Sequence, residues 1–282
     1  MPPLNESQNS VEIEQVVHDQ DTAKVQKWLD HNQYSKNGIL RYEKIFGRTF
    51  VSTGGEKTTR KYTEMLDLKP SMQVLDICCG TGGSAFFMAR EYEVSVHGVD
   101  LSTNMLQLAN NYRAEMEPEV KHRVQFHEED VTKMSYPREF YNCVYSRDAI
   151  MHIPNKLALY KKFYETLKPG GKVLVTDYCI GSRDYSPKFG EYLKDRGYHL
   201  VTVDEYRQIL VDAGFKEVKA IDTTDMFLEV LHEELDHFLA IEKEFVEEFS
   251  KEDFDWIVKG WKIKIERCGQ GEQRWGLVMG TK

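Results

Sequence analysis

The feature that most constrains the fold is a glycine-rich turn that directly follows an apolar run. Residues 74–83 read V-L-D-I-C-C-G-T-G-G, with one carboxylate, Asp76, inside the apolar part. A second apolar run, V-S-V-H-G-V-D, ends in Asp100. Glycines in such a turn let backbone N–H groups approach a ligand without a Cβ in the way, and a carboxylate after the second strand suits the two hydroxyls of a ribose. The pairing predicts a nucleotide-like ligand at the start of an α/β domain.

Strand-like and helical patterns alternate along the chain from residue 73 onward. Such alternation predicts an α/β fold, with a mainly parallel sheet and helices on both of its faces. The segment L-K-P-G-G at 167–171 ends a helix and leads into the apolar run K-V-L-V-T-D-Y. We expect helices at 83–91, 103–116, 154–167 and 203–213, and strands at 73–78, 94–99, 123–127, 140–146, 171–178 and 216–221, with a terminal strand in the last run, Q-R-W-G-L-V-M-G-T-K.

Segments on either side of this alternation complete the expected domain, residues 21–282. Residues 1–20 are polar and carry no apolar face, so we expect a mobile tail there. Helical spacing marks three stretches before the first strand, 21–29, 39–46 and 56–65. The strongly acidic stretch 223–266 is rich in helical pattern, which predicts a helical insertion before the last strand.

Composition and charge argue against several classes of protein. The 282 residues are 41% hydrophobic and 29% charged, which is ordinary for a globular domain. No apolar stretch approaches the roughly 18 to 20 residues that span a bilayer, and the first ten residues lack the features of a secretory signal. The net charge of −9 argues against nucleic acid as the main partner, because phosphate backbones attract basic surfaces.

The cysteines favour a reducing compartment. There are five, no C-x-x-C occurs, and most lie in expected strands or at strand ends. This pattern indicates free thiols rather than disulfides or a metal site, so we expect a cytoplasmic protein without a bound metal. The five are Cys78, Cys79, Cys143, Cys179 and Cys268.

The details of the turn separate two kinds of nucleotide. A dinucleotide fingerprint requires G-x-G-x-x-G, which C-x-G-x-G-G at 78–83 fits poorly, so a dehydrogenase is the weaker interpretation. The segment resembles the first motif of class I methyltransferases, an acidic residue followed by G-x-G-x-G, with Cys78 in the first glycine position. Asp130 ends the third expected strand, where such enzymes hold the adenine amine, and Asp148 follows the fourth. The resemblance implies S-adenosylmethionine as cofactor and a Rossmann-like sheet, mostly parallel with an antiparallel last strand.

Further segments resemble one family of methyltransferases. They are N-Q-Y-S at 32–35, I-F-G-R-T-F-V-S-T-G-G at 45–55, Y-S-R-D-A-I-M-H at 145–152, T-D-Y-C at 176–179, E-Y-L-K-D-R-G-Y at 191–198 and the closing G-W-K-I-K…Q-R-W-G. Over roughly residues 25–282 the set resembles the phosphoethanolamine N-methyltransferases of plants, nematodes and protozoan parasites. This resemblance implies S-adenosylmethionine-dependent N-methylation of phosphoethanolamine, or of its mono- and dimethyl forms, to phosphocholine, which feeds phosphatidylcholine synthesis.

The resemblance also implies roles for individual residues. Tyr34 and His152 match the catalytic pair, with Asp148 beside the amine, and Tyr34 is expected to hydrogen-bond to His152 and close the site. Because Tyr34 precedes the core fold, region 21–65 is expected to be a helical lid. Cofactor positions are Ser52, Gly80, Asp100, Leu101, Asp130 and Val131. Substrate positions besides Tyr34 and Asp148 are Gln33, Val51, Tyr178, Tyr192, Arg196, Tyr198 and Lys264.

These residue types also suit the chemistry in their own right. An amine accepts a methyl group from a sulfonium through its lone pair, so a protonated amine must first lose a proton, and histidine titrates in the useful range. Asp148 can orient the amine and favour the positive charge of the product, while tyrosine faces can hold a methylammonium by cation–π contact. Arg196 and Lys264 can neutralise a phosphate.

Other interpretations stay open. Taken alone, His152 before Ile153-Pro154 fits a capping or core-edge histidine better than a base, and Arg196 and Lys264 fit solvated surface cations. The alternative functions are methylation of another small amine or a sterol, and non-catalytic binding of S-adenosylmethionine. As partners we expect a small phosphobase substrate, with no nucleic acid and no membrane, and we expect a monomer.

Overall fold

The fold is a single sheet with helices packed around it, seen in a computed structural model that describes residues 22–31 and 34–282. The expected tail, residues 1–20, and the predicted substrate residue Gln33 lie outside the described residues. The sheet has seven strands in the order β3-β2-β1-β4-β5-β7-β6. They are β1 (Gln73–Ile77), β2 (Ser95–Asp100), β3 (Val124–Glu128), β4 (Tyr141–Arg147), β5 (Leu167–Ile180), β6 (Lys216–Asp222) and β7 (Gln273–Thr281).

The strand directions confirm the predicted class of fold. Strands β1 to β5 pair in parallel, whereas β7 runs antiparallel to both of its neighbours, β5 and β6. From β1 the chain builds outward to β3 and then returns to the other side of β1 as β4. The strand order therefore reverses between β1 and β4, and open α/β sheets bind ligands at such a reversal.

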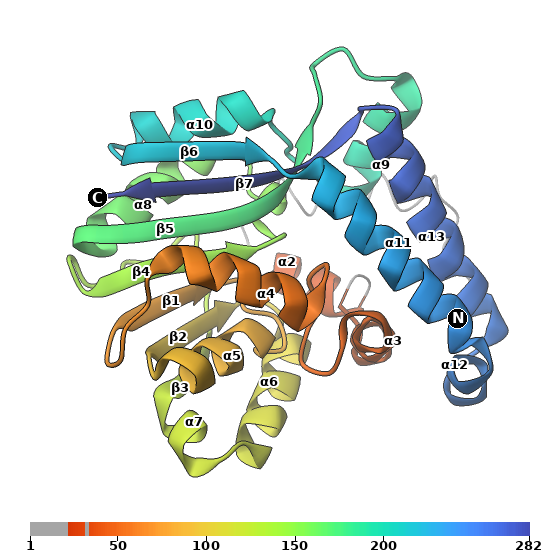
Figure 1. Cartoon of the computed structure of the whole chain (residues 1–282), viewed down its shortest axis with the longest axis horizontal. Helices are drawn as coiled ribbons and strands as arrows, with labels where there is room; N and C mark the ends of the chain where they lie inside the picture. The colour runs from red at the N-terminus through yellow and green to blue at the C-terminus, as the bar shows by residue number, and fades with distance from the viewer. Residues whose placement is uncertain (1–21, 32–33) are drawn as a thin grey trace.

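Helices cover both faces because neighbouring strand residues point to opposite sides. Val74 of β1 packs into one apolar layer, and Leu75, the next residue, packs into the other. The first layer lies under α4 (Gly55–Thr63) and α5 (Gly83–Tyr92), and the second under α8 (Lys156–Thr166) and α10 (Val203–Asp212) (Figure 1). Strands β2 and β3 are also contacted by α6 (Thr103–Glu115) and α7 (Pro118–Arg123).

The described elements differ from the predicted ones mainly around two short helices. The pattern did not predict α7 or α9 (Pro187–Arg196). Helix α7 has six residues, too few for a helical period to show, whereas α9 carried readable signals: Ser186 caps it, Pro187 opens it and Gly197 ends it. The helix expected to reach residue 167 ends at Thr166, because Leu167 pairs with Tyr141 and begins β5.

Further helices precede β1 or lie between β6 and β7. Before β1 come α2 (Thr22–His31), α3 (Lys36–Phe46), α4 and the 3₁₀ turn η1 (Glu64–Leu66). Between β6 and β7 come α11 (Thr224–Ala240), α12 (Glu242–Glu248) and α13 (Lys251–Gly269). Helix α11 packs against both α13 and α3, and these three helices lie beyond the carboxyl ends of the strands, as Figure 1 shows at the right of the view.

The glycine turn adopts the backbone that its sequence suggests, including its one irregular position. Gly80 and Gly82 have φ of +56° and +89°, in the left-handed region that suits glycine. Cys78, which stands where the methyltransferase motif has glycine, also has a positive φ of +55°. Its side chain packs at the edge of the second apolar layer. The cysteine thus keeps the turn conformation that a glycine would adopt more readily.

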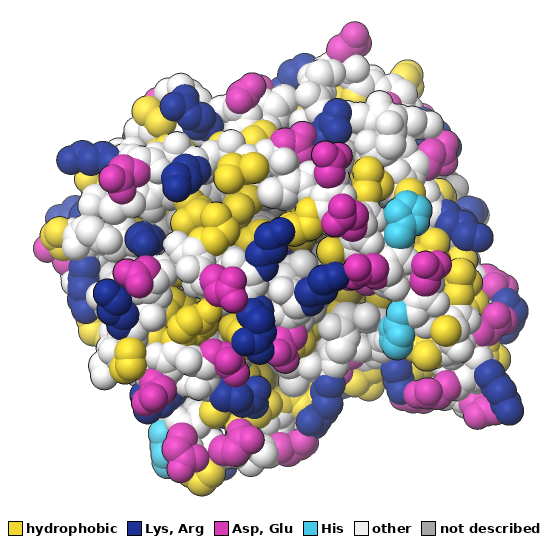
Figure 2. Space-filling view, in the orientation of Figure 1, with side chains coloured by type: hydrophobic (Ala, Val, Ile, Leu, Met, Phe, Trp, Pro, Cys, Tyr) yellow, Lys and Arg dark blue, Asp and Glu magenta, His cyan; other side chains and the backbone are white. Residues whose placement is uncertain are grey.

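Charges of both signs are mixed on the surface that Figure 2 shows, and the cysteines form no disulfides. Figure 2 shows Lys and Arg side chains interspersed with Asp and Glu over the face that carries α4 and α11. All five cysteines are unpaired thiols. Within residues 22–31 and 34–282, no helix combines the length and apolarity needed to cross a bilayer.

Asp76, in the middle of β1, is a buried acid at the base of the turn. It is 2% exposed, and its Oδ2 has no hydrogen-bond partner among the described residues. Burial raises the pKa of Asp76 to about 8, and the nearby charge of Asp100 adds to the rise while Arg147 opposes it. The folded chain therefore binds a proton at Asp76 that the unfolded chain releases near its ordinary pKa of 3.8.

This difference predicts that Asp76 makes the apo protein less stable as the pH rises. Between about pH 4 and 8 the folded state holds the Asp76 proton and the unfolded state does not, so the contribution falls by at most about 1.4 kcal/mol per pH unit. Denaturant titrations from pH 5 to 8 should give a flatter stability curve for Asp76→Asn than for the wild type. Parallel curves would show that Asp76 is ionised in the folded protein.

Candidate active site

The candidate site lies at the carboxyl ends of the strands, on both sides of the reversal in strand order. Turn 78–83 follows β1, Asp100 ends β2, Asp148 follows β4 and Tyr178 lies close to the end of β5. These strands are neighbours in the sheet, so their ends meet at one edge. Helices α3, α11 and α13 lie beyond that edge (Figure 1).

Two backbone donors hold Asp100 against the turn. Gly80 N–H donates to Oδ2 over 2.9 Å, and Ser102 N–H donates to Oδ1 over 2.9 Å. Burial raises the pKa of Asp100, although both hydrogen bonds oppose the rise. Leu101 is half-buried directly after it. The carboxylate is thus fixed beside the turn, as expected of a residue that binds ribose hydroxyls.

The loop before α4 clamps the turn from another side. Gly83 N–H donates to the carbonyl of Thr49 over 2.9 Å. Val51 packs so closely on Gly80 that a Cβ there would lie 2.7 Å from Val51 Cγ2. Ser52, the next residue in the loop, is half-buried and accepts a hydrogen bond through its carbonyl from the start of α4. The predicted substrate residue Val51 therefore meets the turn, and the predicted cofactor residue Ser52 follows it in the same loop.

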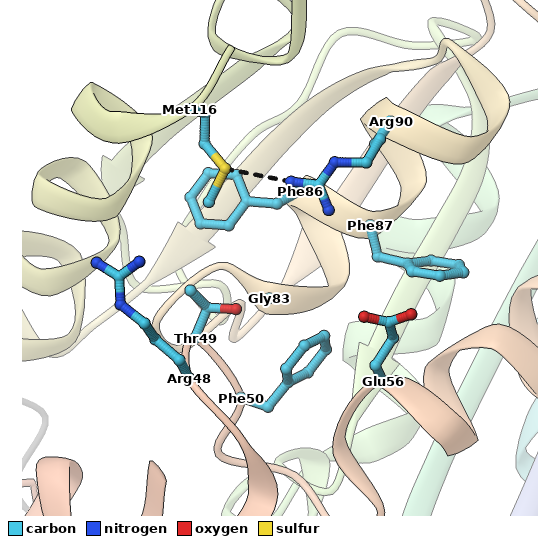
Figure 3. A pocket seen from close by; sticks show the side chains of 9 residues that line it. All are labelled: Arg48, Thr49, Phe50, Glu56, Gly83, Phe86, Phe87, Arg90 and Met116. Atoms are coloured by element: carbon cyan, nitrogen blue, oxygen red, sulfur yellow. Dashed lines mark hydrogen bonds between the residues drawn. The ribbon is translucent and has the colours of Figure 1, made fainter.

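A surface pocket on the outer side of this loop is separate from the candidate site. Figure 3 shows its lining residues: Arg48, Thr49, Phe50, Glu56, Gly83, Phe86, Phe87, Arg90 and Met116. None of them is a predicted site residue. The Arg48 guanidinium already pairs with Glu115, and Arg90 donates to the Met116 sulfur over 3.4 Å. The groups suited to the predicted chemistry therefore lie at the sheet edge and not in this pocket.

Asp130 lies just beyond β3 with both oxygens engaged. Oδ1 accepts from Thr132 N–H over 3.0 Å and from Thr132 Oγ1 over 2.6 Å, and Oδ2 accepts from Thr22 Oγ1 over 2.7 Å. Partial burial acts to raise the pKa of Asp130, but the hydrogen bonds from Thr132 and Thr22 lower it overall. The next residue, Val131, is buried. The predicted adenine-side carboxylate is therefore in contact with helix α2.

Asp30 fastens α2 to the same side of the molecule. Its carboxylate accepts hydrogen bonds from Ser102 Oγ (2.5 Å), from Thr103 N–H (3.2 Å) and from the Thr103 hydroxyl, at the first turn of α6. Asn104 Nδ2 donates to the carbonyls of Asp30 (3.0 Å) and Tyr34 (2.9 Å). Because the first N–H groups of a helix lack partners within the helix, a carboxylate there is stabilising. Helix α2 and Tyr34 are thereby tied to α6.

The two carboxylate oxygens of Asp148 differ, because among the described residues only Oδ1 has hydrogen-bond partners. Oδ1 accepts from Trp275 Nε1 over 2.7 Å and from Thr176 Oγ1 over 2.9 Å. Oδ2 lies 3.8 Å from Arg147 Nη2 and, among the described residues, has no hydrogen-bond partner although it is buried. The residue has a φ of +52°, and its N–H donates to the carbonyl of Thr176 over 2.7 Å. Asp148 is therefore a fixed carboxylate with one oxygen available to a ligand.

His152 is the last residue of the 3₁₀ turn η2 (Ile150–His152), which is the first element after β4. Its ring packs edge-on against Tyr198, with centroids 5.0 Å apart. Within the described part of the chain, Nε2 has no hydrogen-bond partner although it is buried. Burial, together with the positive charges of Lys156 and Arg196, lowers the pKa of His152 to about 4. The imidazole is therefore neutral at neutral pH and able to accept a proton.

The structure does not form the predicted hydrogen bond between Tyr34 and His152. Both residues are described, and no hydrogen bond joins them. Burial and the negative charge of Asp100 raise the pKa of the Tyr34 hydroxyl, whereas Arg196 opposes the rise. Tyr34 therefore lies within electrostatic reach of Asp100 and Arg196, but no hydrogen bond joins it to His152.

The predicted tyrosines gather into one aromatic cluster. Tyr198 lies between Tyr178 and Tyr192, with ring centroids 6.4 Å and 5.8 Å away. Arg196, the last residue of α9, stands 5.8 Å from the ring centre of Tyr192. Its pKa is raised because these phenols more than offset the effect of burial. Among the described residues no carboxylate forms an ion pair with Arg196, so the cation is available to an anion.

Lys264 approaches the same cluster from α13. Its Nζ lies 3.3 Å from the Tyr178 hydroxyl and 4.4 Å from the ring centre of Trp261. Burial lowers the pKa of Lys264 to about 8, although the carboxylate of Glu234 opposes the fall. Glu234 is itself buried and accepts from Gly54 N–H over 2.6 Å and from Trp261 Nε1 over 3.1 Å.

Sequence reasoning missed four residues that shape this site. Arg267 stands 3.6 Å from the ring centre of Tyr192, and a signal for it existed, since it lies three positions after Lys264 on one helix face. Arg147 and Trp275 lie in segments that carry the family resemblance, but no role was assigned to either, and no local pattern marked Glu234, because each acts through contacts made only in the folded chain. Of the predicted residues, only Gln33 cannot be placed, as it lies outside the described part.

The fold and the arrangement at its strand ends define a class I methyltransferase. Residues 74–171 match the family model described as a methyltransferase domain. A solved structure similar to this chain is Haemonchus contortus phosphoethanolamine N-methyltransferase 2 in complex with phosphomonomethylethanolamine and S-adenosylhomocysteine. Its TM-score is 0.88 at 34% identity, and the match covers 91% of this chain and 59% of that one.

Relatives in sequence define the family more closely. The chain is 49% identical to phosphoethanolamine N-methyltransferase 3 of Arabidopsis thaliana, over 91% of this chain and 52% of that protein. It is 34% identical to the phosphoethanolamine N-methyltransferase of Plasmodium falciparum (isolate 3D7), over 90% of this chain and 95% of that protein. The chain belongs to the phosphoethanolamine N-methyltransferase family. It spans about half the length of the plant relatives that it matches.

Proposed function

We propose that this chain methylates the nitrogen of phosphoethanolamine, or of its mono- and dimethyl forms, toward phosphocholine, with S-adenosylmethionine as methyl donor. One arrangement carries the proposal. A buried carboxylate oxygen of Asp148 and a buried nitrogen of His152, both without partners among the described residues, flank a tyrosine cluster that Arg196 and Lys264 enter. A substrate with an amine at one end and a phosphate at the other needs these groups together.

The residues around the turn fit the proposed cofactor. Asp100 is fixed beside Gly80, and the close packing of Val51 on Gly80 leaves room for backbone alone. When bound, S-adenosylmethionine supplies an electrophilic methyl group on its sulfonium. We propose that Asp100 and Ser52 hold its nucleoside part and that Asp130 faces the adenine, with Thr22 already on one oxygen.

His152 is the proposed base. A protonated amine cannot attack a methyl group, so a neutral imidazole must take its proton first. The imidazole is neutral because burial lowers the pKa of His152 to about 4. Arg196 contributes to that lowering, so a phosphate bound to Arg196 would raise the basicity of the imidazole. Substrate binding would in this way prepare the base.

Arg196 and Lys264 are the proposed phosphate ligands. Arg196 offers a planar, permanently charged donor fork, and Lys264 offers a compact ammonium beside the Tyr178 hydroxyl. A phosphate beside Lys264 would also favour its protonated form, against the burial that lowers its pKa to about 8. Arg267 lies close enough to act on the pKa of Lys264 and adds positive charge at the same end.

The decisive experiment is methyl transfer with phosphoethanolamine, phosphomonomethylethanolamine and phosphodimethylethanolamine, each assayed separately. S-Adenosylhomocysteine formed with one or more of them supports the proposal. Binding of S-adenosylmethionine without turnover of any of the three would favour the non-catalytic alternative. Turnover of a sterol or of a small amine without phosphate would favour the other methyltransferases.

We further propose a cytosolic location, which the five unpaired cysteines support, since thiols stay reduced there. The monomeric state expected from the sequence stays a prediction, and sedimentation equilibrium would test it.

We propose that helices α2 and α3 of the expected lid region 21–65 act as a lid over both ligands, with Asp30 as its fastening, whereas α4 of that region packs on the sheet. Asp30→Ala should lower the free energy of unfolding by about 0.5–2 kcal/mol, the usual cost of a lost helix cap, and speed amide exchange in residues 22–31. Asp255→Ala, on an exposed face of α13, is the matched control. Exchange in residues 22–31 that is unchanged by the substitution and by both ligands would contradict the lid.

His152→Ala should lower turnover by about 100- to 10,000-fold, the range typical of a general base, while the affinity for S-adenosylmethionine stays within about 3-fold. Steady-state kinetics and calorimetry measure the two effects. His232→Ala, an exposed histidine on α11, should leave both unchanged. A His152→Ala protein with wild-type turnover would remove this residue from the mechanism.

Arg196→Ala should raise the Michaelis constant for the phosphobase by about 10- to 100-fold, as expected for a lost hydrogen bond to a charged group, and lower turnover at saturation less. Lys188→Ala, exposed on the same helix α9, is the control and should change neither constant. An unchanged Michaelis constant would place the phosphate elsewhere and favour a substrate without one.

A further inference from the structure

The carboxylate of Asp148 cannot hold its own orientation, because a free aspartate side chain rotates about its terminal torsion. In this chain Oδ1 accepts hydrogen bonds from two donors, Trp275 Nε1 and Thr176 Oγ1, whereas Oδ2 has no hydrogen-bond partner among the described residues. Two donors on a single oxygen define the plane of the carboxylate and therefore where the second oxygen points.

Trp275 is itself immobilised on every side. It is fully buried, and its ring contacts Phe227 at 4.8 Å and Tyr62 at 5.7 Å between centroids. Its backbone N–H donates to Thr224 Oγ1 over 3.0 Å, and its carbonyl accepts from Thr223 N–H over 2.8 Å. Trp275 lies on β7, directly opposite Tyr178 of β5. The indole N–H therefore arrives at Asp148 from a rigid strand and not from a loop.

Arg147 completes the surroundings of the carboxylate. Its guanidinium lies 3.8 Å from Asp148 Oδ2, but its own N–H groups are directed to threonine oxygens, over 2.8 Å for both Thr176 Oγ1 and the Thr53 carbonyl. It therefore supplies charge to Oδ2 without occupying the oxygen. The lone pairs of Oδ2 remain available to an N–H donor from outside.

We infer that Trp275 is a positioning residue for the amine of the substrate: its indole N–H holds Asp148 Oδ1 so that Oδ2 accepts a hydrogen bond from the ammonium group. This inference rests on the proposed function and assigns a role to a residue outside its catalytic and binding set. It has a consequence for specificity. A primary ammonium has N–H groups for both His152 and Oδ2, whereas a protonated dimethylamine has a single N–H, which is the one that His152 must take, so the hydrogen bond to Oδ2 matters more for the less methylated substrate.

The test is the dissociation constant of each phosphobase in the presence of S-adenosylhomocysteine, measured by calorimetry, for the wild type and Trp275→Phe. Phenylalanine keeps a buried aromatic ring and removes the donor. We expect binding of phosphoethanolamine to weaken by about 10- to 100-fold, as for a lost hydrogen bond to a charged group, and binding of phosphodimethylethanolamine to weaken at least about 3-fold less. Affinity for S-adenosylhomocysteine should stay within about 3-fold.

A double-substitution cycle separates positioning from general damage to the core. In the Asp148→Asn background the further change Trp275→Phe should weaken phosphoethanolamine binding by less than about 2-fold, because the carboxylate that it orients is gone. Phe254→Leu removes part of another buried aromatic, packed on Phe238 and Phe245, and should lower thermal stability without changing the ratio of the two affinities. If Trp275→Phe does not fold, Trp275→Leu keeps an apolar side chain, removes the same donor to Oδ1 and carries the same expectation.

Equal weakening for both phosphobases, or full additivity in the cycle, would assign Trp275 a structural role only and overturn the inference while leaving the proposed function intact. A wild-type protein that neither binds nor methylates any of the three phosphobases would overturn the proposed function, and this inference with it.

Discussion

The buried guanidinium of Arg147 is the interaction on which the site depends. Its side chain is 3% exposed, and burying an arginine costs several kcal/mol unless its donors are satisfied. Here Nε donates to the hydroxyl of Thr176 in β5. Nη1 donates to the hydroxyl of Thr59 in α4, and Nη2 donates to the carbonyl of Thr53, just before α4. One charge thus ties the N-terminal helices to the end of β4. It also fixes the position at which the next residue, Asp148, leaves the strand.

A second buried ionisable group, Glu234, links the helices that follow β6 to the loop before α4. Glu234 of α11 reaches Gly54 at the head of α4, and its negative charge favours the protonated form of Lys264. Burial raises the pKa of Glu234 to about 7. The Glu234 carboxylate therefore interacts both with Lys264, a proposed phosphate ligand, and with Gly54 at the end of the loop that carries Ser52.

How much of this was readable from sequence depends on how local each signal is. The turn after β1 was predictable because φ above zero calls for glycine, and even Cys78 keeps that backbone. Asp100 was predictable because it ends an apolar strand beside that turn. The Trp275–Asp148 hydrogen bond joins residues 127 positions apart and arises only from the antiparallel register of β7, which no short pattern contains. The Tyr34–His152 hydrogen bond, taken from the family resemblance, is not formed in the described chain.

The position of the last strand also has a consequence for how the protein is made. Strand β7 lies between β5 and β6 in the sheet, although it follows both in the chain. While residues 1–272 are emerging from the ribosome, β5 has one edge uncovered and β6 has no neighbouring strand among the described elements. Uncovered strand edges can pair with other chains. The strand that covers both edges also brings the indole of Trp275 to Asp148, so closure of the sheet and fixation of this carboxylate depend on the same strand.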